Sequence, residues 1–235
     1  MARTLNQQAH SVKRSAILET ARELVESRGY EQMAIQDILD TLQISKGAFY
    51  HYFDSKQALL GALIDSLVEG AAQILSPIVH DPQRPALEKL QLFFVNLARW
   101  KGAHQPMVLA LLAAWYTDDN AIVRQKMRSA GTRRLVPLLG LIIQQGCDED
   151  SMTVTYPEQA AGVIVTLGMG LQETIAEQLL SQPETATPFA LEATIAAYSD
   201  ALARVLGAPA AAFELFQSTL LEDWRTVMRE QAAGR

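Results

Sequence analysis

Two short apolar segments lie close together near the start of the sequence, and their spacing constrains the fold more than any other feature. The first covers residues 35–42, and only about three residues separate it from the run Ser45-Lys46-Gly47-Ala48-Phe49-Tyr50-His51-Tyr52-Phe53. Both segments have the period of a helix rather than the alternation of a strand. Two helices joined by so tight a turn must cross steeply, so the sequence predicts a helix-turn-helix arrangement here.

The rest of the sequence also has helical periodicity, and no alternating strand pattern appears in it. A first helix is predicted over 11–28, where Ile17, Ala21 and Val25 recur on one face and Gly29 stands where a left-handed residue would end the helix. Later helices are predicted over 57–77, 86–102, 106–116, 119–146, 158–180, 189–206 and 210–230. The predicted fold class is therefore all-α.

Local residues set the expected ends of two of these later helices. Asp54 or Ser55 can cap the helix that ends by Pro77. Pro137 is expected to kink or split the helix over 119–146, because proline removes a hydrogen bond from a helix interior.

The balance of charge differs between two parts of the chain. The 235 residues include 20 Lys and Arg against 26 Asp and Glu, a net charge of −6, so any contact with nucleic acid must be local. Residues 1–56 hold seven residues of each sign, and residues 57–235 carry the whole deficit. We therefore predict a domain boundary between residues 56 and 57, with the helix-turn-helix in the first domain.

The second helix of the helix-turn-helix has the residue types that a DNA-recognition helix needs. A serine can cap it, a lysine supplies a cation in its first turn, and the glycine and alanine after the lysine let the backbone approach base edges. The next polar residues, a tyrosine and a histidine, offer donors to phosphate, and a lysine on the following helix can reach the same DNA backbone. The predicted DNA-binding residues are Gln36, Ser45, Lys46, Gly47, Ala48, Tyr50, His51 and Lys56.

Two aromatic residues in this run are predicted to be structural. Phe49 and Phe53 lie four residues apart, and a small domain needs an apolar anchor between its helices, so we expect core residues rather than base-stacking ones. The polar residues could instead form only a solvated face, but their joint placement around one helix favours DNA contact.

Residues about 11 to 67, above all Ile44-Ser45-Lys46-Gly47-Ala48-Phe49-Tyr50-His51-Tyr52-Phe53-Asp54-Ser55-Lys56, resemble the DNA-binding domain of the TetR family of bacterial transcription regulators. The resemblance implies an all-helical homodimer with a small-molecule pocket in the C-terminal domain. Two positions depart from the family pattern: Ala34 stands where a capping Thr is usual, and Gln43 where the turn usually has Gly. The first predicts a weaker cap on the second helix, and the second predicts a slightly different turn geometry.

The same resemblance implies a ligand-responsive transcriptional regulator, a repressor that releases a pseudo-palindromic double-stranded DNA operator when a small molecule binds residues 57–235. We expect the effector to be largely apolar, because apolar sites between helices are where small ligands bind. The candidate effector-binding residues are Trp100, Met107, Leu111, Trp115 and Met127. The dimer is expected to form through the helices over 158–180 and 210–230, the second of which has an apolar stripe of Phe213, Phe216, Leu220, Trp224 and Val227.

Other function classes have less support in the sequence. No nucleotide-binding or metalloprotease motif occurs, and the histidines lack metal-ligand spacing, so we expect neither an enzyme nor a cofactor or metal site. No uncharged run is long enough for a membrane span, no export signal is seen, and Cys147 is the single cysteine, so we expect a cytoplasmic protein. The alternative is a helical module that binds a protein partner through the same helices.

Overall fold

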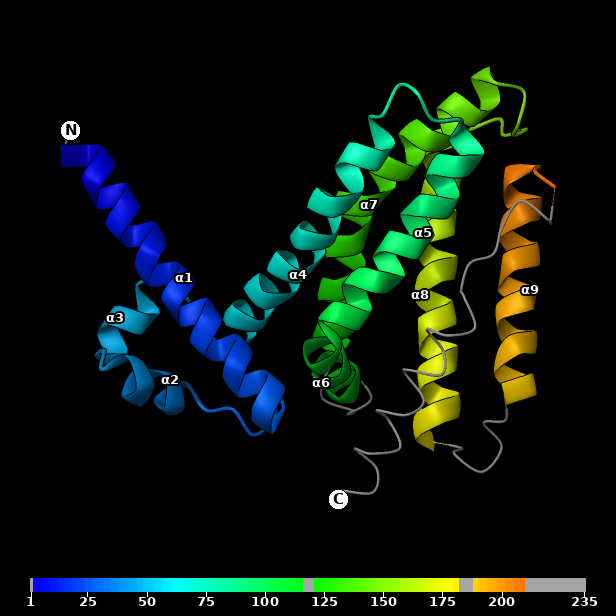
Figure 1. Cartoon of the computed structure of the whole chain (residues 1–235). Helices are drawn as coiled ribbons and strands as arrows, with labels where there is room; N and C mark the ends of the chain where they lie inside the picture. The colour runs from blue at the N-terminus through cyan, green and yellow to red at the C-terminus, as the bar shows by residue number, and fades with distance from the viewer. Residues whose placement is uncertain (1, 116–120, 182–187, 210–235) are drawn as a thin grey trace. The chain divides into compact units, whose positions relative to one another are not determined.

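The computed structural model describes residues 2–115, 121–181 and 188–209, and within these ranges the chain is helical with no β-strand (Figure 1). The helices are α1 (Ala2–Arg28), α2 (Ile35–Leu42), α3 (Lys46–Tyr50), α4 (Lys56–Val79), α5 (Ala86–Ala103), α6 (Gln105–Trp115), α7 (Ala121–Asp148), α8 (Pro157–Ser181) and α9 (Pro188–Leu206). The all-α fold class is confirmed. The helix predicted over 210–230, with its apolar stripe, lies outside the described residues.

Two helix ends differ from what periodicity predicts. α1 begins at Ala2 rather than at residue 11. Residues 2–10 are helical but lack the apolar repeat from which a helix is predicted. α4 does not end by Pro77 but continues to Val79, and the His80 N–H still donates to the Ser76 carbonyl at 3.1 Å. A proline this close to the helix end removes one hydrogen bond without stopping the helix.

α7 runs through Pro137 without a break, so the expectation that this proline would split the helix is wrong. Pro137 is exposed in the chain. The proline ring therefore lies on the solvent side of the helix, where its bulk displaces no core residue.

The chain forms two compact units. The first contains residues 1–67 and 104–127, and the second contains residues 68–103 and 128–235. The boundary predicted between residues 56 and 57 separates a DNA-binding domain from an effector-binding domain. This is a division by function, and it stays a prediction. In the first unit α1 packs against both α2 and α6. The buried apolar residues that α1 to α4 contribute to this unit include Ile17, Ala21, Val25, Ile38, Phe49, Phe53, Leu59, Leu60 and Ile64.

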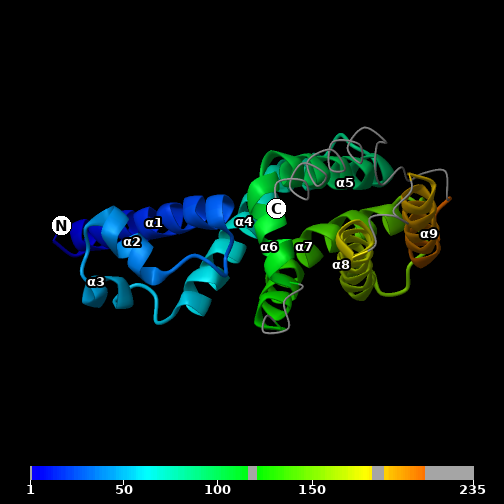
Figure 2. The ribbon, with the colours of Figure 1, turned by 90° about the horizontal axis from the view of Figure 1, so that it is seen from below.

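The second unit consists of long helices over a large apolar core. α8 and α9 lie side by side in both views (Figures 1 and 2). Lys89 is buried in this unit, and its ammonium donates to the Val79 carbonyl at 2.8 Å and to Gln145 Oε1 at 2.7 Å. These bonds offset the desolvation of the charge and satisfy a carbonyl at the end of α4. The core includes Leu75, Leu90, Phe93, Leu139, Ile142, Ile164, Leu202 and Leu206.

Two glycines of the second unit let large side chains approach a helix backbone. A Cβ atom on Gly70 of α4 would lie 2.4 Å from the indole of Trp100, and one on Gly131 of α7 would lie 2.5 Å from the methyl group of Met169. Both contacts are too close for any other residue type without rearrangement.

α4 is the helix within the described ranges that is long and apolar enough to cross a membrane, with a mean hydropathy of 1.5 in its most apolar window. Its residues Leu59, Leu60, Ile64 and Leu75 are buried in the protein core. Core helices of globular proteins share this length and composition, so α4 by itself is weak evidence for a membrane span.

Candidate nucleic-acid interface

The turn between α2 and α3 fixes how these two helices cross. Gln43 ends α2 in the left-handed conformation, with φ 53° and ψ 42°. The backbone N–H groups of Gln43 and Ile44 both donate to the Leu39 carbonyl. Glycine takes this conformation at lower cost than glutamine does. The departure at Gln43 therefore adds a conformational cost that glycine would avoid, and the slightly different turn geometry stays a prediction.

α2 begins without a capping side chain at Ala34, and Asp37 takes over part of that role. Asp37 Oδ2 accepts a hydrogen bond from the Ala34 N–H at 2.8 Å, which is the reverse arm of a capping box. The Asp37 N–H in turn donates to the Ala34 carbonyl at 3.2 Å. Arg28 lies 3.6 Å from the other Asp37 oxygen and helps to orient the carboxylate. The start of α2 is thus held despite the missing hydroxyl.

α3 is held by one cap and one aromatic anchor. Ser45 Oγ accepts a hydrogen bond from the Ala48 N–H at 3.2 Å, which confirms the predicted cap. Phe49 is fully buried and Phe53 nearly so, with their ring centroids 6.0 Å apart. Both are core residues, as predicted.

Most of the predicted DNA-binding residues lie on the solvent side of this anchor. Tyr50 is 41% exposed, and its ring meets that of Phe49 edge-on at 5.4 Å. The Gln36 amide donates to Asp40 Oδ1 at 2.7 Å, so this side chain already has a partner on α2. Ala48 and Lys56 are half-buried, and the exposed members of the set are Gln36, Ser45, Lys46, Gly47, Tyr50 and His51.

Lys56 begins α4 and binds the loop that precedes α2. Its ammonium donates to the Glu31 carbonyl at 3.1 Å and lies 4.5 Å from the centre of the Tyr30 ring. Burial lowers the pKa of Lys56, and the Glu31 carboxylate opposes that shift. An ammonium has three N–H donors, so two are left for a DNA phosphate. Ser55 caps the same helix, because its Oγ accepts from the Ala58 N–H at 3.0 Å.

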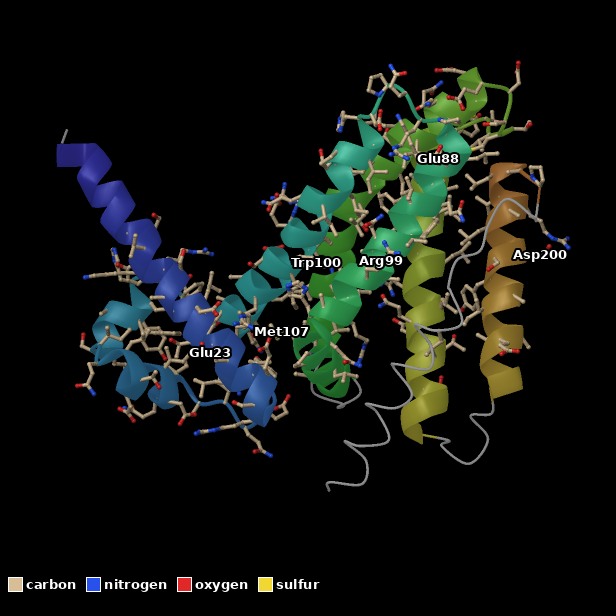
Figure 3. All side chains as sticks on the ribbon, in the orientation of Figure 1. Glu23, Glu88, Arg99, Trp100, Met107 and Asp200 are labelled. Carbon is tan, nitrogen blue, oxygen red and sulfur yellow. The ribbon has the colours of Figure 1, made fainter. Side chains whose placement is uncertain are left out.

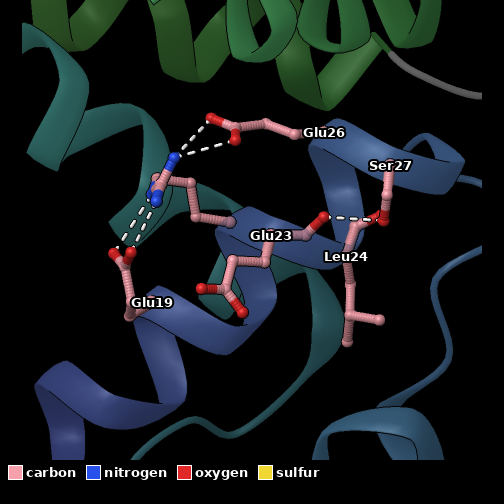
Figure 4. A network of polar contacts seen from close by, with 6 residues as sticks. Glu19, Glu23, Leu24, Glu26 and Ser27 are labelled. Carbon is pink, nitrogen blue, oxygen red and sulfur yellow. Dashed lines mark hydrogen bonds and ion pairs between the residues drawn. The ribbon is translucent and has the colours of Figure 1, made fainter.

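The central part of α1 carries a cation that is already neutralised. Arg22 bridges Glu19 and Glu26, and its Nη1 lies 2.7 Å from Glu26 Oε1 (Figure 4). The hydrogen bond between Arg22 and Glu19 lowers the pKa of the carboxyl and raises that of the guanidinium. A guanidinium shared by two carboxylates attracts DNA little. Among the side chains described in the first unit, the exposed cations without an ion pair include Lys13, Arg14 and Lys46.

Two residues of α1 that lie beside α3 or the turn after it are not among the residues predicted from the sequence. The His10 ring, from α1, has its centroid 4.6 Å from that of Tyr52 and 5.5 Å from that of His51. One turn later Arg14 lies 5.0 Å from the centre of the Phe53 ring. These contacts depend on how α1 crosses the end of α3, which spacing along α1 does not reveal. The available signal was a histidine and an arginine four residues apart, and thus on one helix face, in a polar segment.

Known proteins have sequences similar to this one in the helix-turn-helix region and beyond it. Residues 17–63 match the model of the family described as bacterial regulatory proteins, tetR family. The HTH-type transcriptional regulator EthR of Mycolicibacterium smegmatis is 34% identical to this chain over 173 residues, which are 64% of this chain and 78% of EthR. The chain belongs to the tetR family.

Other comparisons agree with this assignment. The HTH-type transcriptional repressor NemR of Escherichia coli is 25% identical over 170 residues, which are 71% of this chain and 85% of NemR. The crystal structure of a TetR-family transcriptional regulator from Pectobacterium atrosepticum has the same fold, with a TM-score of 0.65 and 20% identity, covering 85% of this chain and 96% of that chain. This tetR-family chain is a DNA-binding transcriptional regulator.

The predicted effector-binding residues of this tetR-family protein are divided between the two units. In the second unit Trp100, near the end of α5, is half-buried (Figure 3). In the first unit Met107 and Leu111 of α6 are each 2% exposed, and Met127 of α7 is half-buried. The Trp115 side chain lies outside the described part of the chain. The effector site therefore stays a prediction.

Proposed function

We propose that this tetR-family regulator is a repressor that binds operator DNA as a homodimer in the bacterial cytoplasm and releases it when a small molecule binds. The observation that carries the proposal is α3, a capped helix on buried Phe49 that exposes Lys46, Tyr50 and His51. The relative NemR, which is named a repressor, supports repression as the output. Residues 1–56 bind DNA, and residues 57–235 bind the effector and form the dimer.

In this mechanism α3 enters the major groove. Lys46 lies in its first turn, where recognition helices contact base edges. Tyr50, His51 and Lys56 contact phosphates and fix the register of the helix without identifying bases. The two α3 helices of the homodimer lie about 34 Å apart, on successive major grooves of a pseudo-palindromic operator. Because the chain as a whole carries a charge of −6, these local contacts supply the affinity.

Release from DNA depends on a difference in affinity between two states of the protein. The effector must bind the DNA-incompetent state more tightly than the competent one, or it shifts no population. A small and largely apolar effector suits the candidate residues, which are Trp100, Met107, Leu111, Trp115 and Met127. Two of them, Met107 and Leu111, lie on α6, which packs against α1 within the first unit. α6 therefore offers a route from an effector to the DNA-binding helices.

A mobility-shift assay with the DNA that flanks the protein's own gene tests DNA binding directly. We expect sequence-dependent binding, and Lys46→Ala should weaken it about tenfold, because a hydrogen bond to a charged group contributes about 1.5 kcal/mol. Arg204→Ala is the matched control, since it removes an exposed cation from α9 in the second unit. A folded protein that binds no duplex would favour the alternative, a helical module for a protein partner.

The homodimer is tested at an exposed apolar residue of α8. Leu171 is unsuitable because it is 3% exposed in a single chain, so a charge there would disrupt the core. Val163 on the same helix is 48% exposed, and Val163→Glu should reduce the mass measured by light scattering from two chains to one. Ile74→Glu on α4, also at an exposed apolar position, should leave two chains. An unchanged mass for Val163→Glu would place the interface elsewhere.

A further inference from the structure

Two imidazole rings from distant parts of the sequence meet at the end of α3. The centroids of the His10 and His51 rings lie 5.5 Å apart, with the ring planes at 76°. The Tyr52 ring packs against both, with its centroid 4.6 Å from that of His10 and 5.2 Å from that of His51. Both histidines are exposed, whereas Tyr52 is half-buried. The tyrosine therefore holds two solvent-facing imidazoles beside each other.

These imidazoles make few contacts within the fold. In the described ranges, each makes ring contacts, and the structure gives neither side chain a hydrogen bond or an ion pair. Both side chains are exposed, and His51 follows directly after α3, which carries the exposed Lys46 and Tyr50. A pair of unused donors next to the recognition helix indicates a ligand from outside the chain.

The charges on the surrounding elements favour an anion as that ligand. On α1 the Glu19 and Glu26 carboxylates pair with Arg22, and Glu23 is exposed. On α2 the Asp37 and Asp40 carboxylates accept from the Ala34 N–H and the Gln36 amide. Asp54 is exposed in the turn after α3. Two adjacent imidazolium rings would repel each other, and an anion bound by both would offset that repulsion. The cations on these elements include Lys13 and Arg14 of α1, Lys46 of α3 and Lys56 of α4.

We propose that His10 and His51 together bind one phosphate of the DNA backbone, and that protonation of the pair strengthens this contact. The inference rests on the proposed function, and it adds the N-terminal half of α1 to the DNA-binding surface. Histidine is the side chain that changes charge between about pH 5 and pH 8. A phosphate stabilises the protonated ring, so DNA binding takes up a proton and the affinity rises as the pH falls.

Fluorescence anisotropy of the full-length protein with a labelled mixed-sequence duplex measures this contact, because phosphates do not depend on sequence. At constant ionic strength, the affinity of the unaltered protein should rise about tenfold between about pH 8 and about pH 6. His10→Gln and His51→Gln should each reduce that rise to about threefold or less, and the double variant should abolish it. His80→Gln is the matched control, since it removes an exposed imidazole from the end of α4 and should leave the rise unchanged.

The salt dependence of binding separates a phosphate contact from a purely structural role of His10. At about pH 6, the double variant should reduce the slope of log affinity against log salt by about one unit, and His10→Gln should reduce it by part of that amount. At about pH 8 both slopes should equal that of the unaltered protein. A His10→Gln protein that binds more weakly by the same factor at both pH values, with an unchanged slope, would overturn the proposal and make His10 a packing residue.

The same measurements distinguish failure of this inference from failure of the proposed function. If the unaltered protein binds the duplex, Lys46→Ala weakens binding, and the pH dependence is the same with and without His10, only the inference fails. If the folded protein binds no duplex at either pH, both the proposed function and the inference fail.

Discussion

The two units hold their helices in different ways. In the first unit α2 has eight residues and α3 has five, too few for either helix to be stable alone. They depend on single contacts: the hydrogen bonds of Asp37 and Ser45 at their starts and the buried ring of Phe49. The second unit holds α8, with 25 residues, and α7 from residue 128 onward, a helix of 28 residues in all, and both join one continuous apolar core.

This difference shows how the side chains of a recognition surface can remain available for DNA instead of packing in the core. A few buried residues position α3, so outward side chains such as Lys46 and Tyr50 are available for DNA. The consequence is that the stability of the recognition helix depends on very few residues. In the second unit many side chains contribute to one core, so each helix depends less on any single side chain.

The largest expected effect tests where stability is concentrated. Phe49→Ala removes a fully buried ring, so it should lower the free energy of unfolding by about 3–5 kcal/mol and abolish DNA binding. Phe93→Ala is the matched variant, because Phe93 is equally buried but lies in the second unit. Hydrogen exchange should show loss of protection in α2 and α3 for Phe49→Ala alone. Equal loss there for Phe93→Ala would show that the two units are not stabilised separately.

The next effect compares a half-buried lysine of each unit. Lys56, in the first unit, donates to the Glu31 carbonyl, whereas burial lowers the pKa of Lys101, in the second unit, from 10.5 to about 8. Between these pH values the unfolded chain holds a proton that the folded chain has lost, so the stability due to Lys101 rises with pH through this window. Lys101→Met should therefore raise the free energy of unfolding by about 1–3 kcal/mol near pH 7 and by less than about 1 kcal/mol near pH 10.

Urea unfolding at both pH values measures this difference. Lys56→Met removes the bond to Glu31 together with the charge, so it should stabilise the protein at neither pH. A gain from Lys101→Met that is the same at both pH values would mean that better packing, rather than removal of a desolvated charge, is its cause.

The smallest effect concerns the left-handed residues at two helix ends. Gln43→Gly, in the first unit, should raise the free energy of unfolding by about 0.5–1 kcal/mol, because glycine adopts this conformation without a Cβ clash. Gly207→Ala, after α9 in the second unit, should lower it, since its Cβ would lie 2.8 Å from the Thr153 carbonyl oxygen. Thermal unfolding measures both changes. A loss of stability in Gln43→Gly would show that the bond from the Gln43 amide to the Asp40 carbonyl outweighs the strain.

Local features of the fold could be predicted from the sequence. α2 has the predicted ends, and the Ser45 cap and the Phe49 anchor join residues within four positions of each other. The two prolines could not be placed in the same way. Local rules treat Pro77 and Pro137 as helix breakers, whereas the structure keeps one near a helix end and the other on an exposed face.

Contacts between distant segments could not be predicted. The Lys56 bond to the Glu31 carbonyl and the approach of His10 to His51 both result from the way helices of the first unit cross. Apolar spacing also does not tell which face of a helix is buried within one chain. For this reason Leu171 and Val163, both apolar residues of α8, differ greatly in exposure.

The carboxylate of Asp37 has a consequence for how this sequence can change over generations. It binds the Ala34 N–H, and the Asp37 N–H donates to the Ala34 carbonyl, so α2 begins at its predicted residue without a capping hydroxyl at position 34. Ala34→Thr and Asp37→Ala alter hydrogen bonds to two different N–H groups of one capping box, so their effects on stability are coupled rather than independent. Such epistasis lets an exposed position at the start of α2 change without unfolding the helix that follows it.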